Sequence, residues 1–106
     1  MLPITEADFQ ARVMQTAHLT GWMVAHFRPA MTQRGRWVTP MSGDTGFPDL
    51  VLARDGRVIV AELKRDKGIV STGQMRWLSA LGDYGRVWRP RDWPEILAEL
   101  SSRRTV

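Results

Sequence analysis

Two short apolar runs in the middle of the chain, PDLVLA (48–53) and RVIVAELK (57–64), flank the dipeptide Asp55-Gly56. Asp-Gly between two such runs predicts a β-hairpin, because a type I′ turn needs positive φ at both central residues. A two-residue loop also sets the register, which places Asp49 opposite Glu62. Apolar side chains occur on both faces of this hairpin, so we expect a sheet that is covered on both sides.

The rest of the chain alternates between helical and extended patterns. Apolar residues recur at helical spacing after Thr5, a good N-cap residue, and again after Ser71, which opens a Ser-x-x-Gln capping box. The predicted order is a helix over 5–20, a strand over 22–27, a long stretch over 28–45 with room for a small hairpin around Gly35, the central hairpin, a helix from 71, a strand over 84–88 and a helix from 92. This pattern predicts an α/β fold, with a small mixed sheet flanked by helices.

The length of 106 residues predicts a single domain over 1–106. The absence of cysteine excludes a disulfide framework and a thiolate zinc site. The sequence runs from Met1 straight into a polar helix, and no apolar run approaches the ~20 residues of a membrane span. We therefore expect a cytoplasmic protein with no membrane partner. The net charge of +4 and the pI near 10.6 favour an anionic partner, with nucleic acid as the default.

Three charged residues stand at the open end of the predicted hairpin, where the strands are otherwise apolar. Asp49 lies opposite Glu62, and Lys64 shares a face with Glu62 because the two are two positions apart. Like charges opposed at about 5 Å destabilise a strand pair, so the arrangement is a poor choice for stability alone. A hard cation such as Mg²⁺, which proteins hold through one or two carboxylates, would explain it. The alternative is a surface ion pair at an exposed strand end.

The sequence Pro48-Asp49 followed by Glu62-Leu63-Lys64 resembles the PD-(D/E)XK nuclease signature, with its two halves on adjacent strands. The wider chain resembles the VRR-NUC (virus-type replication–repair nuclease) domains of that superfamily, especially the small stand-alone domains of phages and bacteria. The similarity extends over nearly the whole chain, through ITEADFQ, GWMVAHF, GFPDLVLA, AELK and VWRPRDW. It implies a restriction-endonuclease-like αβββαβ core and an Mg²⁺- or Mn²⁺-dependent endonuclease that hydrolyses phosphodiester bonds in DNA.

The resemblance also implies roles for individual residues. Asp49 and Glu62 would hold one or two Mg²⁺ or Mn²⁺ ions, together with the backbone carbonyl of Leu63. Lys64 would orient the attacking water. Glu6 matches a glutamate in the family's first helix that assists metal binding, although the helix dipole alone would favour an acidic residue there.

A further catalytic candidate and the expected substrate come from the same resemblance. Gln74 matches a glutamine near the family's active site, whereas the capping box that begins at Ser71 gives it a structural explanation. Stand-alone members of the family resemble Holliday-junction resolvases and tend to form two-fold dimers. We therefore expect a branched DNA substrate, a homodimer, and a setting in a bacterial or phage-infected cell.

Basic and aromatic residues in the stretch over 28–45 predict contact with nucleic acid, because arginine supplies charge and tryptophan supplies a stacking surface. The stretch leads directly into Asp49. Two further basic residues, in and beyond the connection over 65–70, are candidates for phosphate contacts. The residues expected to bind nucleic acid are Arg28, Arg34, Arg36, Trp37, Lys67 and Arg76. The alternative is a solvated loop and a solvated helix face.

Two other interpretations of the chain stay open. The first is a catalytically silent nucleic-acid-binding module of the same fold, against which the intact set of Asp49, Glu62 and Lys64 argues. The second is a sequence-reading DNA-binding regulator, which would need a helix with exposed base-contacting residues that the sequence does not clearly show. A cleavage assay with and without metal separates all three.

Overall fold

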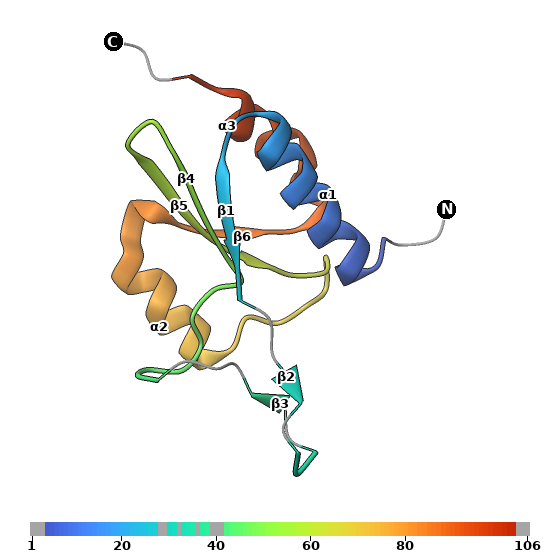
Figure 1. The fold of residues 1–106 in the computed structure, drawn as a ribbon, viewed down its shortest axis with the longest axis vertical. Helices are drawn as coiled ribbons and strands as arrows, with labels where there is room; N and C mark the ends of the chain where they lie inside the picture. Colours follow the sequence, from blue (N-terminus) through green and yellow to red (C-terminus); the bar gives the residue numbers. More distant parts are fainter. Residues whose placement is uncertain (1–3, 28–29, 32, 36, 39–41, 104–106) are drawn as a thin grey trace.

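The computed structural model of the chain describes residues 4–27, 30–31, 33–35, 37–38 and 42–103 (Figure 1). In chain order the described elements are α1 (Glu6–Leu19), β1 (Met23–His26), β2 (Ala30–Met31), β3 (Trp37–Val38), β4 (Leu50–Arg54), β5 (Arg57–Leu63), α2 (Thr72–Leu81), η1 (Gly82–Tyr84), β6 (Gly85–Trp88), η2 (Pro90–Asp92) and α3 (Trp93–Ser101). The predicted α/β class is confirmed. Among the described residues, no helix is long and apolar enough to cross a membrane.

Four of these strands form one mixed sheet in the order β1-β4-β5-β6. β4 pairs antiparallel with both β1 and β5, while β5 and β6 run parallel. A parallel pair needs a crossover connection, which α2 supplies. The order α1, β1, β4, β5, α2, β6 is the expected αβββαβ order. β2 and β3 pair with each other apart from this sheet, as expected for a small hairpin around Gly35.

The β4–β5 hairpin has the predicted turn and register. Both residues of Asp55-Gly56 have positive φ, 51° and 77°, as a type I′ turn requires. At the open end the last ladder pair joins Leu50 to Ala61. The next residues along the two strands are Asp49 and Glu62, so the turn chemistry alone brings these two carboxylates to the same place.

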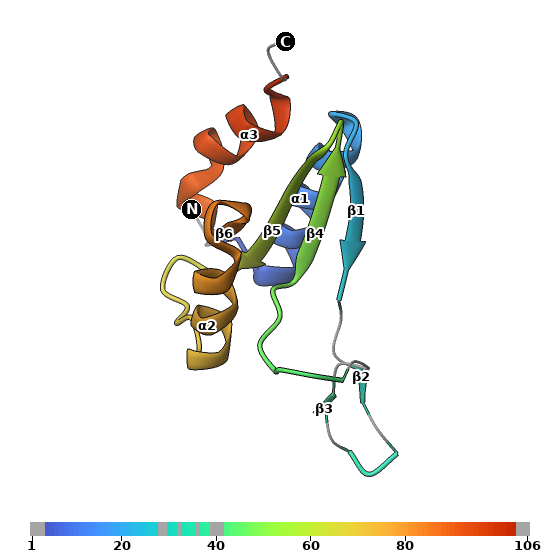
Figure 2. The ribbon, with the colours of Figure 1, turned by 90° about the vertical axis from the view of Figure 1, so that its left-hand side faces the viewer.

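α1 begins at the predicted cap, where the Thr5 side chain accepts a hydrogen bond from the backbone N–H of Asp8 at 3.0 Å. Its buried residues Phe9, Val13 and Ala17 are four positions apart and therefore line one face of the helix. Figure 2 shows α1 behind the strands of the sheet, and α3 joins it in the same core. The core consists of Phe9, Val13, Ala17, Trp22, Leu50, Leu52, Ile59, Ala61, Leu63, Trp88, Ile96 and Leu100.

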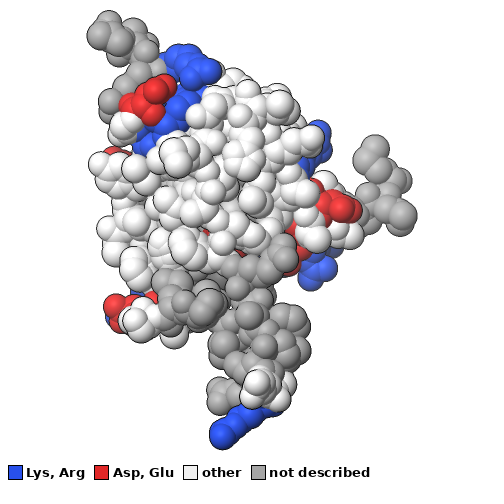
Figure 3. Space-filling model, viewed as in Figure 1, with Lys and Arg blue, Asp and Glu red and all other residues white. Residues whose placement is uncertain are grey.

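The opposite face of the sheet is covered on the β6 side only. The prediction that both faces are covered is therefore wrong for the β1 side of this face. Val60 is buried, whereas Val58 is 41% exposed and Met23 is 78% exposed. α2 spans only ten residues, about 15 Å, and packs at the β6 side, where Leu78 contacts Gly85. The helix is too short to extend over β1 as well. In the view of Figure 3, the centre of the surface consists mostly of uncharged residues.

Candidate active site

Asp49 and Glu62 meet at the open end of the β4–β5 hairpin. The backbone carbonyl of Asp49 accepts a hydrogen bond from the N–H of Phe27 at 2.9 Å, which holds the residue just before β4. Its side chain turns toward β5, where Oδ2 accepts a hydrogen bond from the backbone N–H of Leu63 at 2.9 Å. Glu62 lies within β5, and its side chain is hydrogen-bonded to that of Asp49. The expected juxtaposition of the two carboxyl groups is therefore present.

The Glu62 side chain lies in an unusual environment for a carboxyl group, since the residue is only 2% exposed. Burial, the hydrogen bond with Asp49 and the negative charge of Asp49 raise the pKa of Glu62 to about 9. The charge of Lys64 lowers this pKa, and that of Glu6 raises it further. At neutral pH and without metal, Glu62 therefore keeps its proton, because its pKa lies above neutrality. Among the described residues, Oε2 of Glu62 has no hydrogen-bond partner.

This donor set fits a hard divalent cation. Mg²⁺ and Mn²⁺ prefer oxygen ligands, and a cation at the two carboxylates would offset their repulsion and give the buried Oε2 a partner. Asp49 and Glu62 are the residues that would hold it. Within the described residues, no group of three or more His, Cys, Asp or Glu side chains forms a ready metal cluster. The remaining ligands would therefore come mainly from backbone carbonyls, water and substrate phosphate.

The two further metal ligands expected from the sequence occupy different positions relative to this pair. Leu63 follows Glu62 directly, and its N–H already holds the Asp49 carboxylate. Its carbonyl is therefore a close neighbour of the two carboxyl groups along the strand. Glu6 is exposed in the first turn of α1 and acts on Glu62 through its charge. The structure thus links Glu6 to the site by electrostatics, and its role as a ligand stays a prediction.

Lys64 provides a positive charge beside the two carboxyl groups. It follows β5 directly and is half-buried, and its backbone N–H donates to the carbonyl of Trp88 at 3.0 Å. The side chain leaves the strand on the same face as that of Glu62, because side chains two positions apart share a face. Its charge lowers the pKa of Glu62, which shows that the two groups interact. A phosphate held at the carboxylates through a cation would lie within the field of this ammonium group.

A glycine contact that the sequence analysis missed holds the segment before Asp49 in place. Gly46 has a φ of 93° and packs so closely on the start of α2 that an added Cβ would lie 2.4 Å from the backbone of Gly73. Phe47 packs edge-on against Trp77, with ring centroids 4.9 Å apart. The segment that carries Asp49 is therefore fastened to α2. The sequence held a signal in the glycine of GFPD, but nothing in it indicated the partner.

Gln74 lies at the start of α2 and closes the predicted capping box. Its Oε1 accepts a hydrogen bond from the N–H of Ser71 at 2.9 Å, and its own N–H donates to the Ser71 hydroxyl at 3.2 Å. The structural explanation of this residue is therefore confirmed. A catalytic role for Gln74 stays a prediction. The start of α2 packs against Gly46, which lies just before Asp49 in the sequence, so the position of Gln74 is compatible with that role.

The residues expected to bind nucleic acid are spread over several elements. Arg34 is exposed in the turn between β2 and β3, and Trp37 belongs to β3. Lys67 is exposed in the connection after β5, three positions beyond Lys64. Arg76 is exposed on α2, beside a small hollow that Trp77 also lines. Outside the described residues lie Arg28 and Arg36.

Comparison with known proteins does not identify a family for this chain. No model of a protein family matches it, and no curated protein or solved structure matches it either. The similarity to VRR-NUC domains therefore stays a prediction that depends on the motif residues and on the site geometry described above.

Proposed function

We propose that this protein is a metal-dependent nuclease that hydrolyses phosphodiester bonds in DNA. The observation that carries the proposal is the buried, hydrogen-bonded pair of Asp49 and Glu62, with Lys64 two positions further along the strand. A buried carboxyl with a raised pKa beside a second carboxylate lowers folding stability, and such groups cluster at functional sites. The main structural alternative, an exposed ion pair, does not fit a glutamate that is 2% exposed.

The residues of the site have separate tasks under this proposal. Asp49 and Glu62 would hold one or two Mg²⁺ or Mn²⁺ ions, with the Leu63 carbonyl and Glu6 as further ligands. When bound, the metal would supply positive charge that polarises the scissile phosphate and activates water. Lys64 would orient the attacking water and offset the negative charge that develops on the phosphate. The hydrogen bond from the Leu63 N–H holds the Asp49 carboxylate in place, which reduces the reorganisation that the reaction needs.

The resemblance to stand-alone VRR-NUC domains supports a more specific form of the proposal. Branched DNA, such as a Holliday junction, would be the preferred substrate, and a homodimer would be the acting form. The excess of basic residues supports nucleic acid as the partner. The place of action would be the cytoplasm of a bacterial or phage-infected cell.

Cleavage of labelled junction, flap, duplex and single-stranded DNA in Mg²⁺, Mn²⁺ or EDTA tests the proposal. We expect activity only with metal, and a loss of at least about 100-fold in Asp49→Ala, Glu62→Ala and Lys64→Ala, each of which should still fold. Glu95→Ala removes an exposed carboxylate on α3 and should keep full activity as the matched control. Full activity in EDTA, or in any one of the three site variants, would contradict the proposal of a metal-dependent nuclease.

A catalytically silent nucleic-acid-binding module of the same fold is the second candidate. It is favoured by the finding that the described residues hold no ready cluster of three metal-ligating side chains. This candidate predicts DNA binding that does not depend on metal, and no cleavage of any of the four substrates. Binding measured alongside cleavage in the same assay therefore separates the two functions.

A further inference from the structure

The two parallel strands of the sheet end side by side, next to the candidate active site. β5 ends at Leu63 and β6 ends at Trp88, and these two residues are partners in the ladder. The segments that follow them, 64–68 and 89–92, therefore leave the sheet at the same edge. In open α/β sheets, ligands bind in the crevice outside the carboxyl ends of the parallel strands. This edge is therefore a candidate binding surface on grounds independent of the two carboxylates.

Arg89 fastens these two segments to each other. Its Nη1 donates to the backbone carbonyls of Arg65 and Gly68, both at 2.7 Å, and to that of Asp66 at 3.4 Å. A second tie comes from Arg91, whose backbone N–H donates to Oδ1 of Asp66 at 3.0 Å. Hydrogen bonds from a charged donor are stronger than neutral ones, so the connection after β5 has a defined shape.

A groove of about 480 Å³ lies beside this connection and combines apolar with basic lining residues. Ile4 and Pro90 supply the apolar part, while Arg65 and Lys67, both exposed, supply positive charge. Asp66 is the one carboxylate among the lining residues, and its Oδ1 is already engaged by a backbone N–H. The groove therefore presents net positive charge to solvent.

We propose that this groove binds the phosphate backbone of the nucleic-acid strand that occupies the candidate active site. The proposal rests on the proposed function, because Arg65, which lines the groove, directly follows Lys64, so that a strand held at Lys64 would meet the groove next. The charges of Arg65 and Lys67 complement a polyanion, and the apolar lining would pack against sugars. Arg89 is a positioning residue, since its guanidinium holds the backbone that presents Arg65 and Lys67. Contacts to phosphate carry no sequence preference.

Binding of a short fluorescein-labelled single strand and of the matching duplex, measured by anisotropy in EDTA over a range of salt, tests this groove without cleavage. Lys67→Ala should weaken binding about five- to tenfold near ~0.1 M salt. The same variant should reduce the slope of log affinity against log salt by about 0.9 for duplex and about 0.7 for single strand. Arg65→Ala/Lys67→Ala should double the change in slope, and Lys67→Arg should keep wild-type binding.

Arg103→Ala is the matched control for Lys67→Ala. It also removes one exposed positive charge, but at the far end of the sheet, where Arg103 lies 3.8 Å from Asp55 beside the hairpin turn. We expect this variant to bind DNA as the wild type does, and melting temperatures will show that all variants are folded. Equal losses in Lys67→Ala and Arg103→Ala, or unchanged binding in the double variant, would overturn the proposed groove.

The outcomes also distinguish the groove from the proposed nuclease activity. If the wild type cleaves DNA while the groove variants bind and cleave normally, the groove is overturned and the nuclease stands. If no substrate is cleaved but binding weakens only in the groove variants, the nuclease is overturned and the groove stands as a nucleic-acid-binding surface.

Discussion

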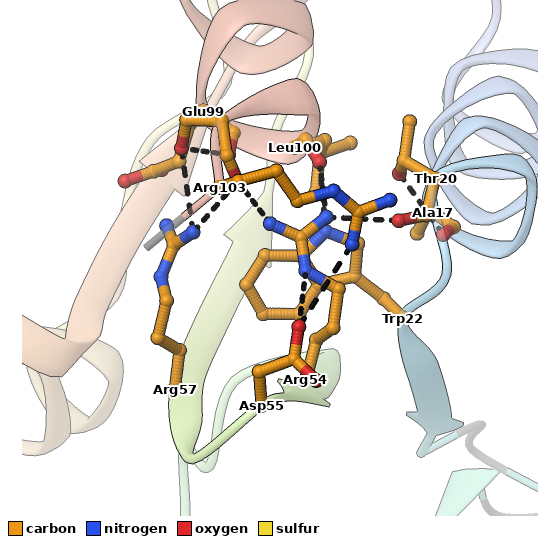
Figure 4. A network of polar contacts seen from close by, with 10 residues as sticks. Ala17, Thr20, Trp22, Arg54, Asp55, Arg57, Glu99, Leu100 and Arg103 are labelled. Atoms are coloured by element: carbon orange, nitrogen blue, oxygen red, sulfur yellow. Dashed lines mark hydrogen bonds and ion pairs between the residues drawn. The ribbon is translucent and has the colours of Figure 1, made fainter. Parts of the chain in front are cut away.

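The β4–β5 hairpin buries an ionisable side chain near each end, and the two groups are partnered in opposite ways. Arg54, at the turn end, is 7% exposed, and Glu62, at the open end, is 2% exposed. The Nη atoms of Arg54 donate to three backbone carbonyls, those of Thr20, Leu100 and Ser102 (Figure 4). Glu62 instead has a second carboxyl group beside it and, as far as the structure describes the chain, an Oε2 without a hydrogen-bond partner.

The environment of Arg54 is that of a structural residue. Its guanidinium carbon lies 4.5 Å from the centroid of the Trp22 ring, and its Nε lies 3.8 Å from the Asp55 carboxylate. Burial and the charges of Arg103 and Arg57 lower the pKa of Arg54, while Asp55 raises it. The carbonyls that it binds lie in or directly after the last turns of α1 and α3, where helices leave acceptors unsatisfied. Arg54 therefore fastens two helix ends to the sheet.

The difference between the two ends shows how a buried charge can be interpreted. A charge with several fixed partners of opposite polarity, such as Arg54, contributes to one folded arrangement. A buried carboxyl group beside a second carboxyl group, such as Glu62 beside Asp49, lowers stability until a ligand supplies the missing partner.

The largest expected effect is the pH dependence of stability at the Glu62 end. Glu62 has a folded-state pKa of about 9 against an ordinary value of 4.5. Between about pH 4.5 and about 9 the folded protein keeps a proton on Glu62 that the unfolded chain has already released. The contribution of this proton to stability is therefore complete below about pH 4.5 and is lost as the pH rises through about 9. In EDTA the free energy of unfolding of the wild type should therefore fall, relative to Glu62→Gln, by about 1.4 kcal/mol per pH unit inside this window. Urea denaturation of both proteins over the pH range measures it, and parallel curves would contradict it.

The turn end should respond to loss of its charge by losing stability. Arg54→Ala removes the hydrogen bonds that join the sheet to two helix ends, together with the packing on Trp22, so the free energy of unfolding should fall by about 2–4 kcal/mol. Arg103→Ala, at an exposed member of the same cluster, should change it by less than about 0.5 kcal/mol. Urea denaturation of the two variants measures both changes. Equal losses in the free energy of unfolding would show that Arg54 is not the structural centre of this end.

Divalent metal should stabilise the open end and leave the turn end untouched. Mg²⁺ at a hundredfold excess over its dissociation constant should add about 2.7 kcal/mol to the free energy of unfolding. Asp49→Asn should raise the melting temperature in EDTA, because it removes the Asp49 charge that helps to raise the pKa of Glu62 and so reduces the stability lost in keeping Glu62 protonated. The same substitution should shrink the further rise with Mg²⁺. Arg103→Ala should keep the full metal response. Thermal melts with EDTA and with Mg²⁺ measure both effects, and equal metal responses in wild type and Asp49→Asn would reject a shared site.

The smallest expected effect tests whether the outlying β2–β3 hairpin works together with the open end. Arg34 is exposed at its turn, so Arg34→Ala should weaken binding to all DNA sequences alike. The slope of log affinity against log salt should fall by about 0.9 for duplex DNA. Anisotropy titrations of the variant and the wild type on two unrelated duplexes give the result. An unchanged affinity and slope would mean that this hairpin does not contact nucleic acid.

Predictions from the sequence succeeded where the interaction is local. The caps at Thr5 and Ser71 form as expected, because each needs only residues within one helical turn. The position of Asp49 beside Glu62 follows from two turn residues, which set the register of the whole hairpin. The carboxylate pair of the candidate site was therefore predictable, although its burial and its hydrogen bonds were not.

Predictions were incomplete or wrong where distant parts of the chain meet. The open face around Val58 depends on how far α2 extends across the sheet, which no local pattern reports. The contact of Gly46 with Gly73 and the carbonyls around Arg89 join segments that are far apart in the sequence. The sequence analysis did not single out Arg54, because its partners lie at the ends of two helices.

Backbone preferences and side-chain spacing over a few residues were sufficient to predict the helices and strands, the register of the hairpin and the position of Asp49 beside Glu62. The tertiary structure alone decided which charges are buried and which are partnered. The parallel pairing of β5 with β6 brought 89–92 beside the connection after Lys64, and the packing of α1 and α3 enclosed Arg54. The burial of a side chain and the identity of its partners depend on contacts between segments that are distant in the sequence, and local sequence patterns do not report such contacts.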